Sequence, residues 1–266
     1  MTNDLHWHTM NQRPPEYSAG AFLLIHGWLG SLLDWRGVAR ELPAGCHLAA
    51  VDLPGHGGTP EWPDEQLTFS TVCEALATIT RTAFGTVRPV VVGYSLGGRI
   101  ALQLAQATPE LLSGVVLIAA HPGLPTEALR AARCASDADR AAELTQLSFE
   151  PFLRHWYSRP PFSSLREKPH LREAIIQQRL SAPPRAPNSL LKALSLGRQP
   201  PPPPSLPLPT LLIAGADDPT YCAIITKFAE QVAALSVIIP DAGHALLHEA
   251  PASVAAALID FFRQQT

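Results

Sequence analysis

The chain has 266 residues, of which 46% are hydrophobic and 16% are charged, and this composition suits one domain with a sizeable buried core. The net charge of −3 argues against nucleic-acid binding, and no apolar run is long enough to insert into a membrane. Met1 to Tyr17 carries no secretory signal and the four cysteines lack CxxC spacing, so we expect a cytoplasmic protein without disulfides or metal.

Short apolar runs alternate with helical patterns along most of the chain. The expected strands are 21–26, 47–51, 90–93, 114–120, 210–214 and 236–239. The expected core helices are 31–42, 69–84, 96–107, 222–234 and 251–263. This alternation predicts an α/β fold with a mostly parallel central sheet flanked by helices. Loops at the carboxyl ends of the strands should then form the functional site.

The first of these strands, 21–26, ends at a histidine and is followed by Trp28. A loop here can direct the backbone N–H of Trp28 towards a negatively charged oxygen at the end of the sheet. His26 and, in the loop 52–58, His56 are candidate bases. Histidine at such a strand end usually satisfies backbone groups of the loop, so we interpret His26 as structural and favour the same role for His56.

The motif 93–97 reads Gly-Tyr-Ser-Leu-Gly and lies between an apolar run and the expected helix 96–107. This spacing is typical of a sharp strand-to-helix turn, on which the serine is exposed and its backbone is strained. The motif therefore predicts that Ser95 is a catalytic nucleophile or base. The N–H of Leu96 would join the N–H of Trp28 in an oxyanion hole.

The interval 125–197 interrupts the alternation, because it has helical stretches but no convincing buried strand. The helical stretches are 127–133, 171–180 and 189–196. We interpret about 121–200 as a helical lid inserted into a single domain, 1–266, whose core is 1–120 and 205–266. A proline-rich connector at 200–209 follows, which we expect to be a stiff spacer; recognition by a proline-binding partner is the alternative.

The lid segment is basic within an acidic protein. Residues 121–200 contain twelve Lys and Arg against seven Asp and Glu, whereas the rest of the chain contains eight against sixteen. Ten of the twelve cations are arginine, whose planar guanidinium matches a carboxylate or phosphate with two parallel hydrogen bonds. A small anionic ligand is therefore expected.

The partners of Ser95 are expected after the last two strands. Asp218 follows 210–214 and His244 follows 236–239, which gives the chain order serine, acid, histidine. His244 would accept the proton of the Ser95 hydroxyl, and a carboxylate would orient the imidazole. We favour Asp218 for that carboxylate, with Asp217 as the alternative. Two further residues complete the assignment: Asp241 is interpreted as a turn residue, and His248 is given no role.

Four segments together resemble the α/β-hydrolase fold and, more narrowly, the family of 2-succinyl-6-hydroxy-2,4-cyclohexadiene-1-carboxylate synthases of the menaquinone pathway. The segments are Val-Asp-Leu-Pro-Gly-His-Gly-Gly at 51–58, Val-Gly-Tyr-Ser-Leu-Gly-Gly-Arg at 92–99, His-Pro-Gly-Leu at 121–124 with Arg130 and Arg133 after it, and Trp-Tyr-Ser-Arg-Pro-Pro-Phe at 156–162. The first is common to many hydrolases, and the other three are narrower. The resemblance extends from about Phe22 to the C terminus.

This resemblance implies a lyase that needs neither metal nor cofactor. Its substrate, 2-succinyl-5-enolpyruvyl-6-hydroxy-3-cyclohexene-1-carboxylate, is a small molecule with several carboxylates. Ser95, made basic by His244 and Asp218, would remove a proton beside the ketone, and pyruvate would be eliminated. The resemblance also implies a set of substrate-binding residues, which are Tyr94, Arg99, Arg133, Trp156 and Arg179.

Two alternatives remain open at this point. One is a carboxylesterase or carbon-carbon bond hydrolase, in which Ser95 attacks a carbonyl and forms an acyl enzyme. The other is a non-catalytic ligand-binding protein with the same fold. The sequence also leaves open the oligomeric state and the choice between menaquinone and phylloquinone production.

Overall fold

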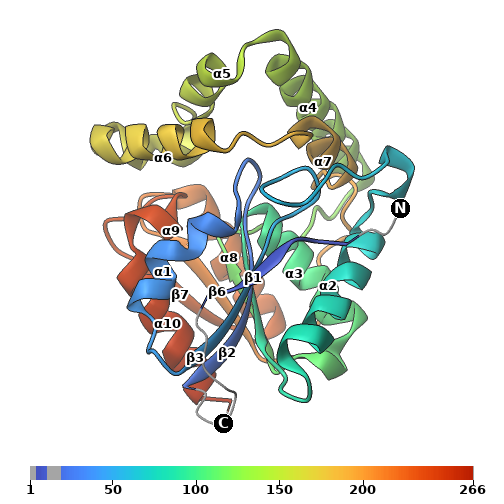
Figure 1. The fold of residues 1–266 in the computed structure, drawn as a ribbon, viewed down its shortest axis with the longest axis vertical. Coiled ribbons are helices and arrows are strands. Elements are labelled where there is room, and N and C mark those ends of the chain that lie inside the picture. Colours follow the sequence, from blue (N-terminus) through green and yellow to red (C-terminus); the bar gives the residue numbers. More distant parts are fainter. Residues whose placement is uncertain (1–3, 11–18, 266) are drawn as a thin grey trace.

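The computed structural model describes residues 4–10 and 19–265, which fold around a seven-stranded sheet (Figure 1). The strands are β1 (Trp7–Thr9), β2 (Gly20–Ile25), β3 (Cys46–Val51), β4 (Val90–Tyr94), β5 (Gly114–Ile118), β6 (Thr210–Gly215) and β7 (Leu235–Ile239). Their order across the sheet is β1-β3-β2-β4-β5-β6-β7. Neighbouring strands are parallel, except that β1 is antiparallel to β3.

Helices cover both faces of the sheet, because its central strands bury side chains on both sides. On one face pack α2 (Phe69–Phe84), α3 (Leu96–Ala107) and α8 (Pro219–Val232). On the other pack α1 (Arg36–Glu41), α9 (Leu246–Glu249) and α10 (Pro251–Arg263). Successive residues of β2 illustrate the alternation, since Phe22 lies in the second cluster and Leu23 in the first.

A helical insertion, residues 121–200, connects β5 to β6. It contains α4 (Glu127–Gln146), α5 (Phe149–Trp156), α6 (Pro169–Ser181) and α7 (Pro187–Ala193), which lie together above the sheet in Figure 1. The insertion has its own small apolar core, in which Phe152 and Ile176 are fully buried. Leu29, from the loop after β2, joins this core, so the insertion packs directly on a loop of the main domain.

The two ends of the helical insertion meet. Gly123 has a φ of +136°, and a side chain there would collide with the backbone of Pro200 to Pro202. The buried Gln199 donates its Nε2 hydrogen to the carbonyl oxygen of Pro122 at 2.9 Å. Residues 200–209, after this contact, contain no helix or strand. The chain therefore leaves and re-enters the core at one place.

Most expected elements match the structure closely, and the differences have local causes. The bounds of α2 match because Thr68 caps its start and Gly85, with a φ of +58°, ends it. The antiparallel strand β1 was not predicted, since three residues are too few to show a pattern. Likewise α5 was missed and α4 extends well beyond 127–133, because both helices are largely exposed and polar on one side.

Two further properties follow from this fold. Across residues 4–10 and 19–265, no helix has the length and hydropathy required to cross a bilayer. All four cysteines are free.

The burial of the central strands predicts a large difference between two leucine substitutions in the same sheet. Leu117→Ala in β5 removes a side chain that is 1% exposed, and should lower the free energy of unfolding by about 2–5 kcal/mol. Leu235→Ala in the edge strand β7 removes one that is 47% exposed, and should change it by about 0.5 kcal/mol at most. Chemical denaturation followed by circular dichroism measures both, and equal losses would contradict the layered core.

Candidate active site

Ser95 lies on the turn between β4 and α3 with a φ of +53°, a strained conformation for a residue with a side chain. Its N–H donates to the carbonyl oxygen of Ile118 at 2.8 Å. A side chain at Gly93 would collide with the backbone of Gly97, and a side chain at Gly97 would collide with the backbone at Ile25. These glycines allow α3 to approach β4 and β2, and so present Ser95 at the end of the sheet.

His244 and Asp218 reach Ser95 from the loops after β7 and β6. The Nε2 atom of His244 lies 3.3 Å from the Ser95 Oγ, and its Nδ1 atom lies 2.9 Å from Asp218 Oδ2. Asp218 is buried, and its other oxygen accepts the N–H of Tyr221 in the first turn of α8. Asp217, the alternative carboxylate, is exposed. The structure therefore brings Ser95, His244 and Asp218 together in hydrogen-bonding order.

Three aromatic rings surround the imidazole of His244. The ring centroids of Tyr94, Phe162 and Tyr221 lie 5.7, 5.3 and 4.6 Å from that of His244. Phe162 belongs to the helical insertion, whereas the other two belong to the core. These rings limit rotation of the imidazole and keep its two nitrogens directed at Ser95 and Asp218.

Trp28 lies in a four-residue turn that the N–H of Gly30 closes on the carbonyl oxygen of Gly27 at 3.0 Å. Leu29 completes this turn with a φ of +65°. The Trp28 indole donates to the carbonyl oxygen of Pro187 in the insertion at 2.8 Å. The N–H of Leu96, at the first position of α3, lies beyond the reach of any intrahelical acceptor. Both predicted oxyanion residues thus border Ser95's end of the sheet.

His26 and His56 lie behind this turn and are fully buried. His26 Nε2 accepts the N–H of Leu53 at 3.0 Å, so its Nδ1 carries the proton and donates to the carbonyl oxygen of Gly27. His56 Nδ1 contacts the carbonyl oxygen of Pro54 at 3.0 Å, and burial with the nearby His26 lowers the pKa of His56 to about 3. Both imidazoles thus form hydrogen bonds with backbone groups of the loops, which is the structural role that we expected from the sequence.

A cavity of about 270 Å³ lies beside Ser95 and His244, between the core and the insertion. Its volume is of the order of that of a small-molecule site. Its lining includes Trp28, Tyr94, Arg133, Trp156 and Arg179. A larger groove of about 1010 Å³ beside α2 contains none of the predicted site residues. In the part of the chain that the structure describes, no cluster of three or more His, Cys, Asp or Glu could hold a metal ion.

One side of this cavity borders an excess of positive charge: Arg133 and Arg140 line it, and Arg99, which is not itself in the lining, lies near Arg133. Arg99 is 6% exposed and donates to the carbonyl oxygen of Leu194 at 2.9 Å, but no carboxylate of the described chain forms an ion pair with it. Burial and the neighbouring Arg133 lower the pKa of Arg99 to about 10, which still leaves it charged at neutral pH. Arg133 and Arg140 share the single buried carboxylate of Asp137. Three guanidinium groups therefore have one counterion.

His121 contributes to the same side of the cavity. Its Nδ1 atom accepts the N–H of Gly123 at 3.1 Å, so the neutral ring carries its proton on Nε2. Burial and the charges of Arg133 and Arg99 lower the pKa of His121 to about 4. The neutral ring is thus a hydrogen-bond donor beside the arginines.

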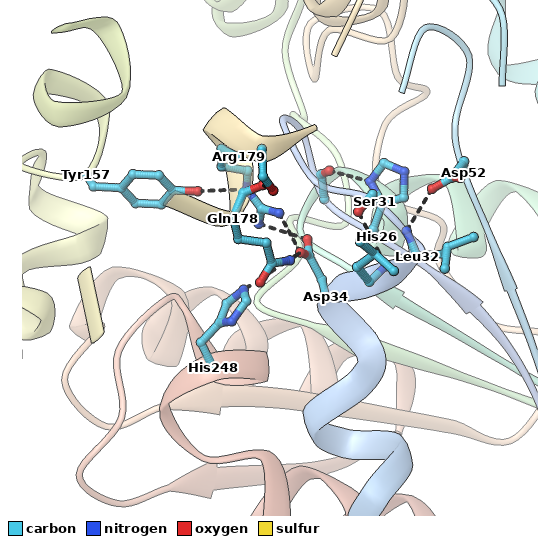
Figure 2. A network of polar contacts seen from close by, with 12 residues as sticks. His26, Ser31, Leu32, Asp34, Asp52, Tyr157, Gln178, Arg179 and His248 are labelled. Atoms are coloured by element: carbon cyan, nitrogen blue, oxygen red, sulfur yellow. Dashed lines mark hydrogen bonds and ion pairs between the residues drawn. The ribbon is translucent and has the colours of Figure 1, made fainter. Parts of the chain in front are cut away.

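Arg179 occupies another part of the cavity lining, and its charge is neutralised. Its two terminal nitrogens bind both carboxylate oxygens of Asp34, Nη2 to Oδ2 at 2.8 Å, and its Nε donates to the Tyr157 hydroxyl at 3.3 Å (Figure 2). Burial acts against the charged guanidinium, but the carboxylate of Asp34 raises the pKa of Arg179 above its ordinary value. Arg179 and Arg99 therefore differ in their electrostatic surroundings.

Of the other residues considered in the sequence, Trp156 lines the cavity, whereas Asp241 does not. The Trp156 ring lies 4.9 Å from the Trp28 ring and also stacks on Phe152, so it serves both the cavity and the core of the insertion. Asp241 has a φ of +55°, as a turn residue does. His248, which had been given no role, also lines the cavity.

Sequence reasoning did not assign several of the cavity residues. Arg140 follows Arg133 by two helical turns, and this spacing on one helix was a usable signal. Tyr157 directly follows the assigned residue Trp156. Its contact partner, Arg179, lies on a different helix, so nothing in the sequence indicated the contact. Tyr221 in the lining had no signal, and neither had Asp34, which does not line the cavity but pairs with Arg179, since only the folded chain brings them to this place.

Comparison with known proteins identifies the fold and the relatives. A family model described as the alpha/beta hydrolase fold matches residues 20–251. The chain is 34% identical over 244 residues to the 2-succinyl-6-hydroxy-2,4-cyclohexadiene-1-carboxylate synthase of Enterobacter sp. (strain 638), covering 91% of each chain. A solved structure of MenH from S. aureus has 25% identity and a TM-score of 0.85, covering 99% of both chains. A malate-bound thermophilic esterase from Thermogutta terrifontis, 23% identical with a TM-score of 0.81 and covering 98% and 93%, shares the fold.

The surroundings of His121 predict an unusually acidic titration. Because its folded pKa is lowered to about 4, the unfolded chain binds the proton more readily between about pH 4 and 6.5. The contribution of His121 to stability should therefore be complete above pH 6.5 and be lost as the pH falls towards 4. NMR titration should show a neutral Nε2–H ring down to about pH 4, with the signal assigned by its absence in His121→Gln. A midpoint near 6.5 would contradict this environment.

Proposed function

Since the chain belongs to the α/β-hydrolase fold family, and within it to the 2-succinyl-6-hydroxy-2,4-cyclohexadiene-1-carboxylate synthases, we propose that it performs their pyruvate-eliminating reaction in menaquinone or phylloquinone biosynthesis. The substrate we propose is 2-succinyl-5-enolpyruvyl-6-hydroxy-3-cyclohexene-1-carboxylate. The enzyme is thus a carbon-oxygen lyase, and we assign Ser95, His244 and Asp218 to its catalytic triad.

The buried charge of Arg99 is the observation that carries this proposal. A buried cation is normally paired, because removing it from water is costly unless an opposite charge compensates. Among the described residues, Arg99 has only a backbone carbonyl as its hydrogen-bond acceptor, and Arg133 and Arg140 share one carboxylate. A ligand with several carboxylates supplies the missing counterions, whereas a neutral ester does not. This favours the lyase substrate over the substrate of an ordinary esterase.

The hydrogen-bond order of the triad suits proton abstraction. Asp218 fixes the proton on Nδ1 of His244, so Nε2 is free to receive the Ser95 proton. The Ser95 oxygen then takes the proton from the carbon beside the ketone. The electron pair moves to the ketone oxygen, where the N–H groups of Trp28 and Leu96 would stabilise the charge. The pair then returns to form one ring double bond, the existing ring double bond shifts by one position, and the bond to the enolpyruvyl oxygen breaks. The expelled enolpyruvate takes up a proton, which the protonated His244 can supply, and becomes pyruvate.

The residues in and beside the cavity wall would orient the substrate. Arg133 and His121 in the lining, with the charge of Arg99 beside them, would bind carboxylates on one side of Ser95, and Arg179 would bind another carboxylate elsewhere in the lining. Tyr94 and Trp156 would shape the apolar part of the wall. A charged, rigid ligand held in this way places the acidic carbon in one position relative to the Ser95 oxygen.

The reaction itself is tested by offering two substrates to the purified protein. We expect rapid pyruvate release from the enolpyruvyl substrate and negligible cleavage of a p-nitrophenyl ester. Ser95→Ala should slow pyruvate release by about 10² to 10⁴, the usual contribution of a positioned base. Pyruvate is followed with a coupled dehydrogenase. An ester adduct on Ser95 during turnover, detected by mass spectrometry, would instead establish nucleophilic catalysis by an acyl enzyme.

The unpaired charge of Arg99 is tested by Arg99→Gln. Loss of a buried charge-assisted contact to a carboxylate costs about 2–5 kcal/mol, so kcat/KM should fall by about 30-fold to 1,000-fold or more. The free energy of unfolding of the ligand-free protein should not fall, because an uncompensated buried charge is removed. The exposed Arg154 offers a matched control, Arg154→Gln, which should leave kcat/KM unchanged. Equal losses of stability and activity in Arg99→Gln would argue that Arg99 is only structural.

A further inference from the structure

Asp34 and Arg179 form an ion pair that is almost completely removed from solvent. Their side chains are 1% and 6% exposed. Both carboxylate oxygens of Asp34 are used, and Oδ1 also accepts the Nε2 hydrogen of Gln178 at 2.8 Å. Figure 2 shows the carboxylate directed at adjacent side chains of α6. Two consecutive residues of the insertion are therefore fixed on one carboxylate of the core.

The pair determines how Arg179 faces the cavity. Of the five N–H groups of its guanidinium, two bind Asp34 and the Nε group binds Tyr157. One N–H on each terminal nitrogen is left over, and Arg179 borders the cavity beside Ser95. A guanidinium that is held through three of its N–H groups has a fixed orientation, so each remaining N–H points in a fixed direction, and one that faces the cavity is preorganised to donate to a ligand carboxylate.

The same pair connects the insertion to the loop that carries Trp28. Asp34 lies in the 3₁₀ turn Leu32–Trp35, six residues after Trp28. A side chain at Gly30 would collide with the Asp34 carboxylate, so the intervening loop is wrapped closely around it. At the other end of the same stretch, the N–H of Leu32 donates to Asp52 at 2.8 Å. Movement of Asp34 would therefore disturb the Trp28 turn as well as Arg179.

We propose that Asp34 is the positioning residue of this site: its carboxylate holds Arg179 in the orientation that binds a substrate carboxylate, and fixes α6 over the loop of Trp28. This inference rests on the proposed function, because the ligand of Arg179 is the anionic substrate. Asp34 itself does not line the cavity and acts through Arg179.

Asp34→Asn keeps the size of the side chain and removes its charge. We expect kcat/KM for pyruvate release to fall by about 10-fold to 100-fold, mainly through KM, because Arg179 binds the carboxylate in the ground state as well as in the transition state. Arg179→Gln should cause a similar loss. Because the two residues act as a unit, the double variant should lose no more than about threefold beyond the worse single variant. Losses that multiply would overturn the proposal.

A second measurement needs no substrate. Hydrogen exchange of the α6 amides in the ligand-free protein should accelerate at least about tenfold in Asp34→Asn, since the helix loses its attachment to the core. The matched control is Glu173→Gln, which breaks the exposed Arg154–Glu173 pair between α5 and α6 and should leave exchange and kcat/KM unchanged. Unchanged exchange in Asp34→Asn would overturn the proposal.

Two further controls cover a variant that does not fold and a protein that does not catalyse the proposed reaction. If Asp34→Asn does not fold, Arg179→Lys replaces it, because lysine keeps the charge but cannot bind both carboxylate oxygens; the same rise in KM and faster exchange are expected, and wild-type values of both would overturn the proposal. If the wild-type protein releases no pyruvate, the proposed function fails, whereas the exchange experiment still decides for or against the attachment of α6 by Asp34.

Discussion

The close approach of α3 to the sheet is the constraint on which the site depends. Gly93 and Gly97 remove the side chains that would keep this helix away from β4 and β2, and the serine between them is held with a positive φ at the end of the sheet. The parallel strands then bring their carboxyl ends to the same edge, so the loops carrying Trp28, Asp218 and His244 reach Ser95 without further adjustment. Backbone strain at one residue is compensated by packing across the whole sheet.

The helical insertion adds charge and enclosure to this arrangement. The arginines of the insertion, together with Arg99 from α3 of the core, differ in how far a carboxylate neutralises them. Asp34 neutralises Arg179, Asp137 is shared between two arginines, and Arg99 has only a backbone carbonyl. The cavity is therefore bordered by positive charge that is unevenly compensated, least so on the side of Arg133, Arg140 and the nearby Arg99. An anionic ligand entering it would have its charged end oriented before any specific contact is complete.

Much of this molecule could be predicted from sequence because its signals are local. The strands and core helices follow from apolar runs and from caps such as Thr68, and the Gly-Tyr-Ser-Leu-Gly motif locates the turn of Ser95. The family expected from four short segments is confirmed by the relatives, and so is the α/β-hydrolase fold. The roles of the triad and of the individual arginines stay predictions. What the sequence could not show are contacts between distant segments, such as Asp34 with Arg179, because an isolated acid on a loop has no local pattern that names its partner.

The meeting of Pro122 and Gly123 with Gln199 and the prolines after it has a consequence for the evolution of such proteins. Because some eighty residues begin and end at one spot on the core, they form a module whose length and composition can change while the strands beneath keep their register. Replacing the helical insertion could thus change the substrate range while the core domain stays the same, provided that the two ends of the new insertion meet at the same junction.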